Sequence, residues 1–377
     1  MNYANRKARE LLHTPAGVRD SFGSEYYDKQ EAVRRIAERI HLYGYRDIQT
    51  PSFEYFDVFS NEIGTTSSRE LYKFFDSEGN TLALRPDFTP SVARCTAKYF
   101  MDEEAPIRFT YQGSTFINTL NLQGKRKEST QMGAELMNDA SPEADGEMLS
   151  LLIECLLDNG LTEFQISVGN VEYFRGLCES LHMDSELEMD LREEFSGKNY
   201  YAAENILRKE GYSRSERDLF LRMQYFMNTE QELIKARDAA PGERAGNAVQ
   251  RLIDVWNVVD AYDFSRYINI DLSLLSKYHY YTGIIFKGYT YGTGEPVASG
   301  GRYDQLLKQF GKNAPAVGFM LSIDSLMEAM RRQHIKGADT PEIRRIYYRK
   351  DNYREALEEA QKSRLKGVRT ELLPGAD

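Results

Sequence analysis

The chain has 377 residues, with 48 Lys and Arg against 58 Asp and Glu, so its formal net charge is −10 at pH 7. This length predicts two or three domains with a buried core, and the acidic balance argues against a broad basic surface for RNA phosphates. No apolar run approaches the roughly 18 residues needed to cross a bilayer, and the N-terminal sequence MNYANRKARELLHTPAG has no apolar signal segment. We therefore expect a cytoplasmic protein that does not contact membranes.

The residue types that most often bind metals show no metal-site pattern. Three cysteines, Cys95, Cys155 and Cys178, are widely spaced and odd in number, which is typical of reduced thiols in a core. The five histidines are not spaced as metal ligands either. The sequence predicts no disulfide framework, no metal site and no cofactor.

The first part of the chain predicts a helix followed by a sheet. An amphipathic helix ends before Gly44, and one of its stripes is apolar, at Val33, Ile36, Ala37 and Ile40. Apolar residues then alternate with polar ones at 107–111 and 164–168, which indicates strands. Strands with little helix between them favour an antiparallel sheet.

The second part of the chain changes character twice. Charged, helix-forming sequence between about 182 and 263 predicts a helical insertion, strand signals return at 268–291, and a helix follows at about 322–332. After Gly337 the sequence predicts a linker and then a strand, a helix and a strand. We therefore expect an α+β fold divided into residues 1–181, 182–263, 264–336 and 337–377.

Four segments carry a resemblance that no single one of them would establish. The order of these segments and the intervals between them are those of class II histidyl-tRNA synthetases. The segments are LRPDFT (84–89), FINTLNLQGKRKESTQMGAE (116–135), SKYHYYTG (276–283), and SGGRYDQLLKQF with APAVGFMLSIDS (299–325). In that superfamily the chain is most similar to the regulatory subunits of ATP phosphoribosyltransferase, the synthetase-like partners of a short catalytic subunit in histidine biosynthesis.

This resemblance implies the architecture in more detail. It implies a class II aminoacyl-tRNA synthetase-like antiparallel sheet core with flanking helices, a helical insertion, and a short C-terminal α/β segment that corresponds to part of an anticodon-binding domain. In the class II pattern a helix and a strand that ends at a proline such as Pro51 form the dimer interface, so a homodimer core is expected.

The resemblance also implies a histidine-binding pocket. A free amino acid presents an ammonium and a carboxylate, and histidine adds an imidazole, so its pocket needs acidic groups, hydrogen-bond partners and aromatic walls. The matching residues are Asp87 and Thr89 for the ammonium, Gln131 for the amino acid backbone, Glu135 and Tyr281 for the imidazole, and Tyr280 and Tyr303 for the walls.

Each of these residues also has an ordinary structural interpretation. Tyr280 and Tyr281 suit a strand, Asp87 suits a turn or a helix cap, and Glu135 suits a solvated strand position. The synthetases moreover usually have glutamate where this chain has Asp87. Only the combination of these residues at the family's spacing favours a pocket.

The same resemblance indicates that amino acid activation has been lost. Adenylation builds negative charge at the α-phosphate of ATP, and the planar fork of arginine is the side chain best suited to bind such oxygens. The arginine positions of the synthetases fall on Ile117, Ser276 and Ser325, none of which carries positive charge. Since losing one such donor costs roughly 10²- to 10³-fold in rate, we expect no enzymatic activity.

Two points remain open in this interpretation. An alignment shifted by a residue or two would leave Arg126 or Arg302 as a substitute arginine. The group that binds the ligand carboxylate in place of the arginine at Ser276 is also open, with Lys277 and a backbone N–H as candidates.

Three functions are compatible with these features. The first is a non-catalytic regulatory subunit that binds histidine as a feedback effector and assembles with the short-form catalytic subunit of ATP phosphoribosyltransferase, without binding tRNA. The second is an active histidyl-tRNA synthetase, and the third is a stand-alone histidine-sensing scaffold. The chain is not itself the transferase, because it lacks a strand leading into an acidic pair and a small-residue phosphate loop.

Overall fold

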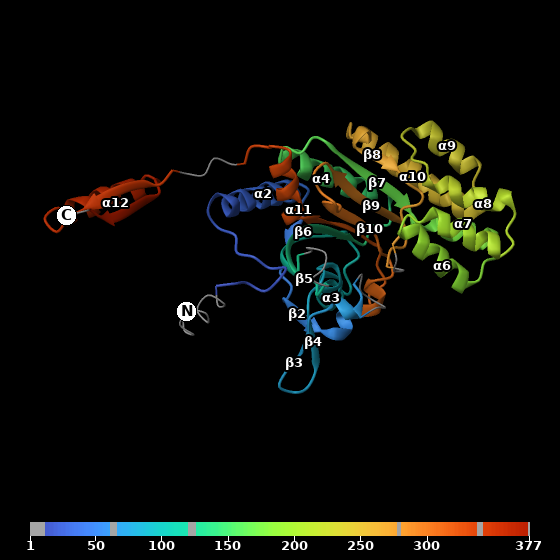
Figure 1. Ribbon diagram of the computed structural model, residues 1–377, viewed down its shortest axis with the longest axis horizontal. Helices are drawn as coiled ribbons and strands as arrows, with labels where there is room; N and C mark the ends of the chain where they lie inside the picture. Colours follow the sequence, from blue (N-terminus) through green and yellow to red (C-terminus); the bar gives the residue numbers. More distant parts are fainter. Residues whose placement is uncertain (1–11, 61–65, 120–125, 277–279, 338–341, 376–377) are drawn as a thin grey trace, which may run out of the picture. The chain divides into compact units, whose positions relative to one another are not determined.

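The computed structural model describes residues 12–60, 66–119, 126–276, 280–337 and 342–375. Its central element is an eight-stranded sheet (Figure 1), in which long strands alternate apolar and polar residues. In spatial order the strands are β1 (Arg46–Asp47), β5 (Ile107–Phe116), β6 (Glu128–Met137), β11 (Ala316–Ser322), β10 (Ala298–Arg302), β9 (Ile284–Thr290), β7 (Phe164–Asn170) and β8 (Ile268–Ile270).

The sheet is antiparallel from β5 through to β7. Only the two outermost strands differ, because β1 pairs with β5 in parallel and β8 pairs with β7 in parallel. The predicted antiparallel core is therefore confirmed, and the parallel edges were not predicted. These edge strands have only two and three residues, too few to show a periodic pattern.

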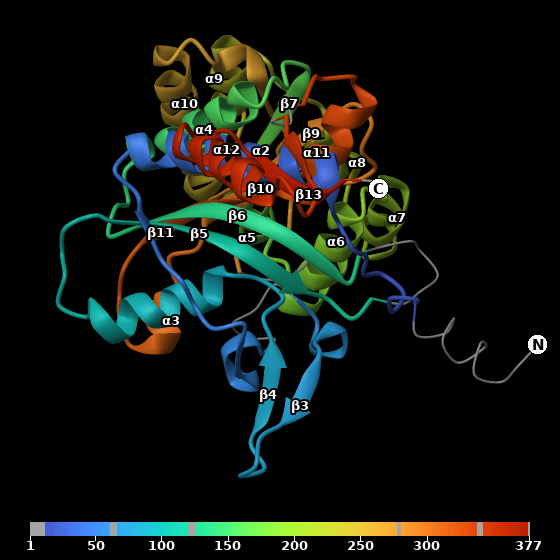
Figure 2. The same cartoon turned by 90° about the vertical axis from the view of Figure 1, so that its left-hand side faces the viewer.

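The two faces of the sheet have different cores. One face packs α2 (Gly23–Leu42), α4 (Pro142–Asp158) and α11 (Ile323–Arg332) against Met132, Ala134 and Leu136. The opposite face packs α3 (Thr89–Tyr99) against Ile107, Phe109 and Tyr111. Figure 2 shows α3 below β5 and β6, with α2 and α4 above them. The buried residues of α2 are Ala32, Val33, Ile36 and Ile40, nearly the predicted stripe.

A smaller sheet leads the chain into α3. It has the order β2 (Phe53–Tyr55), β4 (Thr81–Leu84) and β3 (Lys73–Phe75), and β3 and β4 extend away from the large sheet in Figure 2. Directly after β4, the buried Arg85 donates hydrogen bonds to the carbonyl oxygens of Ser114 (2.8 Å) and Thr50 (2.9 Å) and lies 4.0 Å over the Phe88 ring. These contacts fix the segment that carries Asp87.

The helical insertion is present as five α-helices. It comprises α6 (Ser185–Ser196), α7 (Tyr200–Lys209), α8 (Arg214–Leu221), α9 (Glu230–Asp238) and α10 (Glu243–Ala261), and it follows α5 (Val171–Ser180). Four of these helices begin with a side-chain cap, at Asp184, Asn199, Ser213 and Thr229. Charged, helix-forming sequence with capping residues explains why helices were predictable here. The limits of the insertion, at residues 182 and 263, stay a prediction.

The chain forms two compact units, of which the smaller contains Gly337–Asp377 together with Ser21–Glu31. The predicted C-terminal segment folds as β12 (Arg344–Tyr348), α12 (Tyr353–Leu365) and β13 (Thr370–Pro374). Its two strands pair in parallel, and Ala356 and Ala360 of α12 pack with Ile346. Parallel pairing is the arrangement expected when a helix connects two adjacent strands.

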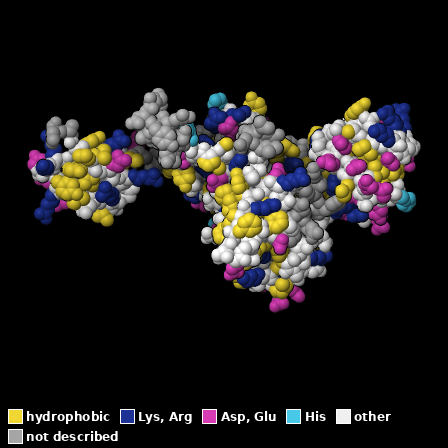
Figure 3. Space-filling view, turned by 60° about the horizontal axis from the view of Figure 1, so that its bottom comes forward, with side chains coloured by type: hydrophobic (Ala, Val, Ile, Leu, Met, Phe, Trp, Pro, Cys, Tyr) yellow, Lys and Arg dark blue, Asp and Glu magenta, His cyan; other side chains and the backbone are white. Residues whose placement is uncertain are grey.

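Charged side chains of both signs are interspersed on the face shown in Figure 3. Among the helices of the described ranges, none combines the length and the apolarity that a bilayer crossing requires. Cys95, Cys155 and Cys178 are free thiols. In the part of the chain that the structure describes, no three His, Cys, Asp or Glu side chains are grouped as metal ligands would be.

Candidate functional site

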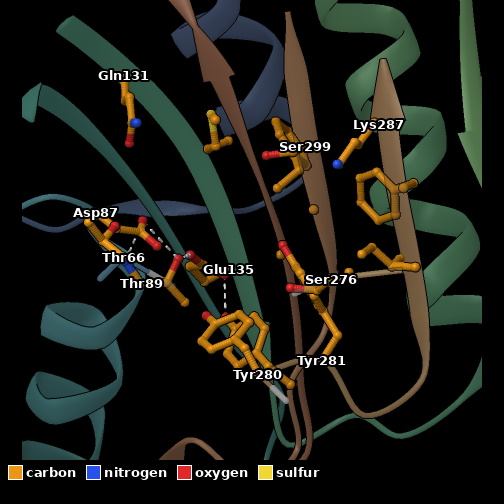
Figure 4. A pocket seen from close by; sticks show the side chains of 18 of the residues that line it. Thr66, Asp87, Thr89, Gln131, Glu135, Ser276, Tyr280, Tyr281, Lys287 and Ser299 are labelled. Carbon is orange, nitrogen blue, oxygen red and sulfur yellow. Dashed lines mark hydrogen bonds between the residues drawn. The ribbon is translucent and has the colours of Figure 1, made fainter. Parts of the chain in front are cut away.

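A cavity of about 410 Å³ lies on the α3 face of the large sheet, and Figure 4 shows the side chains that line it. The cavity brings together all seven residues that the sequence predicted for histidine binding. They are Asp87, Thr89, Gln131, Glu135, Tyr280, Tyr281 and Tyr303. That they bind histidine stays a prediction.

Strand pairing arranges the floor of the cavity in rows. Glu135 of β6 pairs with Gly318 of β11, and Gly318 pairs with Gly301 of β10. In the adjacent row, Gly133, Met320, Ser299 and Lys287 are successive partners across β6, β11, β10 and β9. Residues two apart on a strand point to the same face, so both rows face the cavity.

Glu135 is at the centre of a hydrogen-bond network. Its side chain is buried, its Oε1 accepts a hydrogen bond from the Thr89 hydroxyl at 2.7 Å, and its Oε2 accepts one from the Tyr303 hydroxyl. Burial raises the pKa of Glu135 to about 8, because desolvation outweighs the opposing effect of these hydrogen bonds. Glu135 is thus mostly protonated at neutral pH, and the interpretation as a solvated strand residue is wrong.

Glycines leave the space that the Glu135 carboxyl group occupies. A Cβ atom at Gly318 would lie 1.6 Å from Glu135 Oε2, and one at Gly301 would lie 2.7 Å from the Tyr281 ring. Real Cβ atoms do not approach so closely, so a side chain at either position would displace its neighbour. The glycines of the AVGF and SGGRYD segments are therefore part of the site.

Three tyrosines form the aromatic wall. The Tyr280 ring stacks on Tyr303 with centroids 5.4 Å apart and meets Tyr281 edge-on at 5.0 Å. Burial raises the pKa of all three hydroxyl groups, which keeps them neutral as hydrogen-bond donors at physiological pH. Tyr280 and Tyr281 precede the first residue of β9, Ile284, so they are not residues of a regular strand.

Polar acceptors gather at the α3 side of the cavity. The Asp87 carboxylate accepts a hydrogen bond at 3.3 Å from the backbone N–H of Thr89, the first residue of α3. The buried Gln131 carbonyl oxygen has no hydrogen-bond partner among the described residues. A carboxylate and an amide oxygen facing one cavity are suited to bind an ammonium group.

Of the three positions assigned to missing arginines, two lie at the cavity and one does not. Ile117 and Ser276 line the cavity. Ser325 is not among the lining residues, and its hydroxyl lies 2.8 Å from that of Ser322 at the start of α11. Lys277, the candidate carboxylate partner, lies outside the described residues.

Both substitute arginines are engaged elsewhere. The exposed Arg126 pairs with Asp324 at 3.2 Å. Arg302 is buried and pairs with Asp145 at 2.7 Å on the α4 side of the sheet. Neither residue is among those lining the cavity, so neither supplies a cation there.

The helical insertion borders the cavity through Ser196, at the end of α6. Just beyond it, Lys198 donates hydrogen bonds to Asp271 Oδ2 at 2.7 Å and to Ser273 Oγ at 2.8 Å. The Tyr200 hydroxyl lies 2.9 Å from the same Ser273 oxygen. This network ties the segment that leads to Ser276 to the insertion.

Sequence reasoning missed Lys287 and Ser299, which line the cavity on β9 and β10. The available signal was a lysine inside the apolar strand segment IIFKGYT, where a charged residue is unusual. Figure 4 places both residues on the opposite side of the cavity from Asp87 and Thr89, with the Lys287 amine directed toward Ser299.

Comparisons with known proteins agree with this architecture. Residues 17–326 match the family model described as histidyl-tRNA synthetase. The chain is 35% identical over 97% of its length to an ATP phosphoribosyltransferase regulatory subunit from Ruminiclostridium cellulolyticum, of which 87% is covered, and 33% identical over 96% to one from Acetivibrio thermocellus, of which 86% is covered.

Solved structures show the same likeness. A protein described as an ATP phosphoribosyltransferase regulatory subunit/histidyl-tRNA synthetase from Bacillus halodurans superposes with a TM-score of 0.88 at 31% identity, covering 97% of this chain and 93% of that one. A histidyl-tRNA synthetase from a Nostoc species has a TM-score of 0.81 at 19% identity, covering 97% and 86%, and shares the fold. This chain therefore belongs to the ATP phosphoribosyltransferase regulatory subunit family, which has a histidyl-tRNA synthetase-like fold.

Proposed function

We propose that this protein is the non-catalytic regulatory subunit of an ATP phosphoribosyltransferase and that it binds histidine as a feedback effector in the cavity around Glu135. The observation that carries this proposal is the contrast within one cavity. The buried Glu135 is held by Thr89 and Tyr303, whereas Ile117 and Ser276 occupy the wall without positive charge.

The residues predicted from the sequence provide a partner for each polar part of histidine except its carboxylate. Protonated Glu135 donates to one imidazole nitrogen, and the Tyr281 hydroxyl contacts the other. Asp87 and Gln131 receive the ammonium. A ligand without the imidazole leaves buried polar groups unpaired, and such a mismatch gives strong discrimination between ligands.

The same cavity lacks what adenylation requires. Stabilising the charge at the α-phosphate of ATP takes preorganised cationic donors, and the described lining contains one cation, Lys287. Because Arg126 and Arg302 are paired with Asp324 and Asp145, they do not replace the missing charge. We infer that the protein does not activate histidine.

The partner is inferred from the relatives, which are named regulatory subunits. We infer a homodimer core that assembles with a short-form catalytic subunit and does not bind tRNA. Histidine bound in the cavity then changes the activity of that subunit. Such coupling is reciprocal in binding free energy and is typically about 1–3 kcal/mol, so the catalytic subunit and its substrate should shift the midpoint of a histidine titration.

Calorimetry tests the proposal, with histidine and ATP titrated separately and then with the catalytic subunit present, alongside an ATP–pyrophosphate exchange assay. We expect histidine binding, no histidine-dependent exchange above background, and a complex that histidine inhibits. Glu135→Ala and Tyr281→Phe should still assemble with the catalytic subunit but lose inhibition. Exchange at a rate typical of a synthetase would identify an active enzyme instead. Variants that remain fully sensitive to histidine would place the sensing site elsewhere.

A further inference from the structure

Lys287 is the residue of this cavity that the hydrogen-bond network leaves unexplained. It is partly buried on β9, between apolar neighbours that face the opposite side of the sheet, and its amine is directed into the cavity in Figure 4. Within the described residues it forms no hydrogen bond, and no carboxylate lies within ion-pair distance of it. A partly buried ammonium without a partner is unfavourable unless water or a ligand compensates for its lost hydration.

The described residues around Lys287 offer it no free carboxylate. Burial lowers its pKa, and the nearby Lys198 lowers it further, while Asp271 acts in the opposite direction. Asp271 is already engaged, because it pairs with Lys198 at 2.7 Å and accepts a hydrogen bond from Ser273. Lys287 therefore faces the cavity beside hydroxyl groups, and the nearby carboxylate of Asp271 is already paired with Lys198.

The position of Lys287 is opposite the acidic groups. It lies in the row adjacent to Glu135 and three strands away, through β11, β10 and β9. At about 4.8 Å between strands, the two backbones are roughly 14 Å apart across the sheet. Side chains that reach inward from both strands leave a gap that one small zwitterion can bridge. Asp87 and Lys287 thus give the cavity a negative and a positive end.

We propose that Lys287, supported by the Ser299 hydroxyl on the adjacent strand, binds the carboxylate of the amino acid that occupies the Glu135 end. This rests on the proposed function and deepens it, because it names the group that replaces an arginine at Ser276. An ammonium on a flexible stem meets a carboxylate as a point charge. A lysine ammonium is sufficient to hold the carboxylate of an amino acid. It is less suited than an arginine guanidinium to bind a reacting phosphate.

The experiment compares two ligands on the wild-type protein and three variants. Histidine and histidinol share the imidazole and the amine, but histidinol has an alcohol where histidine has the carboxylate. Their dissociation constants are measured by calorimetry for the wild-type protein, Lys287→Met and Lys287→Arg. Lys308→Met, which alters an exposed lysine of the segment Leu307–Phe310, is the matched control.

We expect the wild-type protein to prefer histidine over histidinol by roughly tenfold to hundredfold, the range of a charge-assisted hydrogen bond. Lys287→Met should weaken histidine binding by that factor and leave histidinol binding unchanged. Lys287→Arg should retain most of the preference, and Lys308→Met all of it. Thermal unfolding of each variant shows whether it is folded, and the arginine variant keeps the test valid if the methionine variant unfolds.

Three results would overturn the inference. Lys287→Met can lower the affinity for both ligands equally, which indicates a general effect on the pocket. It can leave the preference for histidine intact, which assigns the carboxylate to another group. It can abolish binding of pyrophosphate or ATP while histidine binding stays normal, which identifies the anion as a phosphate. A wild-type protein that binds neither histidine nor histidinol contradicts the proposed function itself, and is distinct from these three.

Discussion

The two ends of the cavity differ in how their charged groups are held. At one end, both carboxyl oxygens of Glu135 accept hydrogen bonds from side chains, and Thr89 and Tyr303 come from different elements of the core. At the other end, Lys287 lies beside Ser299 and apolar groups, and the described residues give it no ion pair. The first end is complete without a ligand, whereas the second lacks a negative partner.

This difference separates recognition from reaction in a fold that can carry out both. In the proposed function, the preformed network around Glu135 selects a ring by its shape and protonation, which is how buried polar groups give selectivity. Reaction at a phosphate needs preorganised positive charge instead, and Ile117 and Ser276 supply none. The proposed regulatory role follows if the Glu135 end is retained for binding while the opposite end only anchors the ligand.

The strongest test of the Glu135 end is to fill the space beneath it. In Gly318→Ala the added Cβ would overlap Glu135 Oε2, which lies 1.6 Å from its ideal position. The carboxyl group must then move and lose its alignment, so we expect histidine affinity to fall by about a hundredfold or more, which corresponds to roughly 3 kcal/mol. Calorimetric titration measures this change.

Gly294→Ala is the matched control, because no atom lies within 4 Å of a Cβ at that position. It should bind histidine as the wild-type protein does. If Gly318→Ala also bound histidine normally, the rigid floor inferred for the Glu135 end would be wrong.

Removing the carboxyl group itself should have a somewhat smaller effect. Glu135→Ala leaves a buried imidazole nitrogen without its hydrogen-bond partner, which costs about 1–3 kcal/mol, so histidine should bind roughly fivefold to hundredfold more weakly. The control is Glu128→Ala, which alters an exposed glutamate on the same strand. Equal affinities for the two variants would refute the assignment of the imidazole contact.

The comparison of the two ends also explains which parts of the site were predictable. Glu135, Thr89 and Tyr303 belong to sequence motifs whose order and spacing resemble those of a known family, and each motif residue was predicted for the pocket. Lys287 was not, because a lysine in a strand has no motif around it. Only the pairing of β9 with β10 and β11 brings it into the same cavity as Glu135.

The fold was predictable where the sequence is periodic. The strands β5, β7 and β9 and the capped insertion helices agree with their expected patterns, whereas the two-residue β1 is too short to produce one. The three arginine positions show the same limit, because sequence alignment treats Ile117, Ser276 and Ser325 alike. In space only the first two line the cavity, since Ser325 lies in the first turn of α11 and its hydroxyl lies 2.8 Å from that of Ser322.

The pH dependence of histidine binding gives the smallest and most specific test of the Glu135 end. Burial raises the pKa of Glu135 to about 8, whereas the imidazole of free histidine titrates near 6.5. Between these two pH values the Glu135 carboxyl group is protonated and the imidazole ring is neutral. The complex needs that single proton between the two groups, so affinity should not change with pH in this range.

Above pH 8 neither group holds the proton, and binding must take one up from solvent. Affinity should then fall with rising pH, approaching about tenfold per pH unit, so titrations at pH 7, 8 and 9 should show a decline that is larger in the upper interval than in the lower one. Glu135→Gln has no titrating carboxyl group, so its weaker affinity should decline less from pH 7 to 9 than that of the wild-type protein, because the ammonium group of the ligand titrates in both cases. A wild-type affinity that did not decline would mean that the complex needs no added proton, so that an ionised Glu135 accepts a hydrogen bond from the N–H of the neutral imidazole ring. In that case the Glu135 end would recognise the ring as a donor, and the Tyr281 hydroxyl would donate to its other nitrogen.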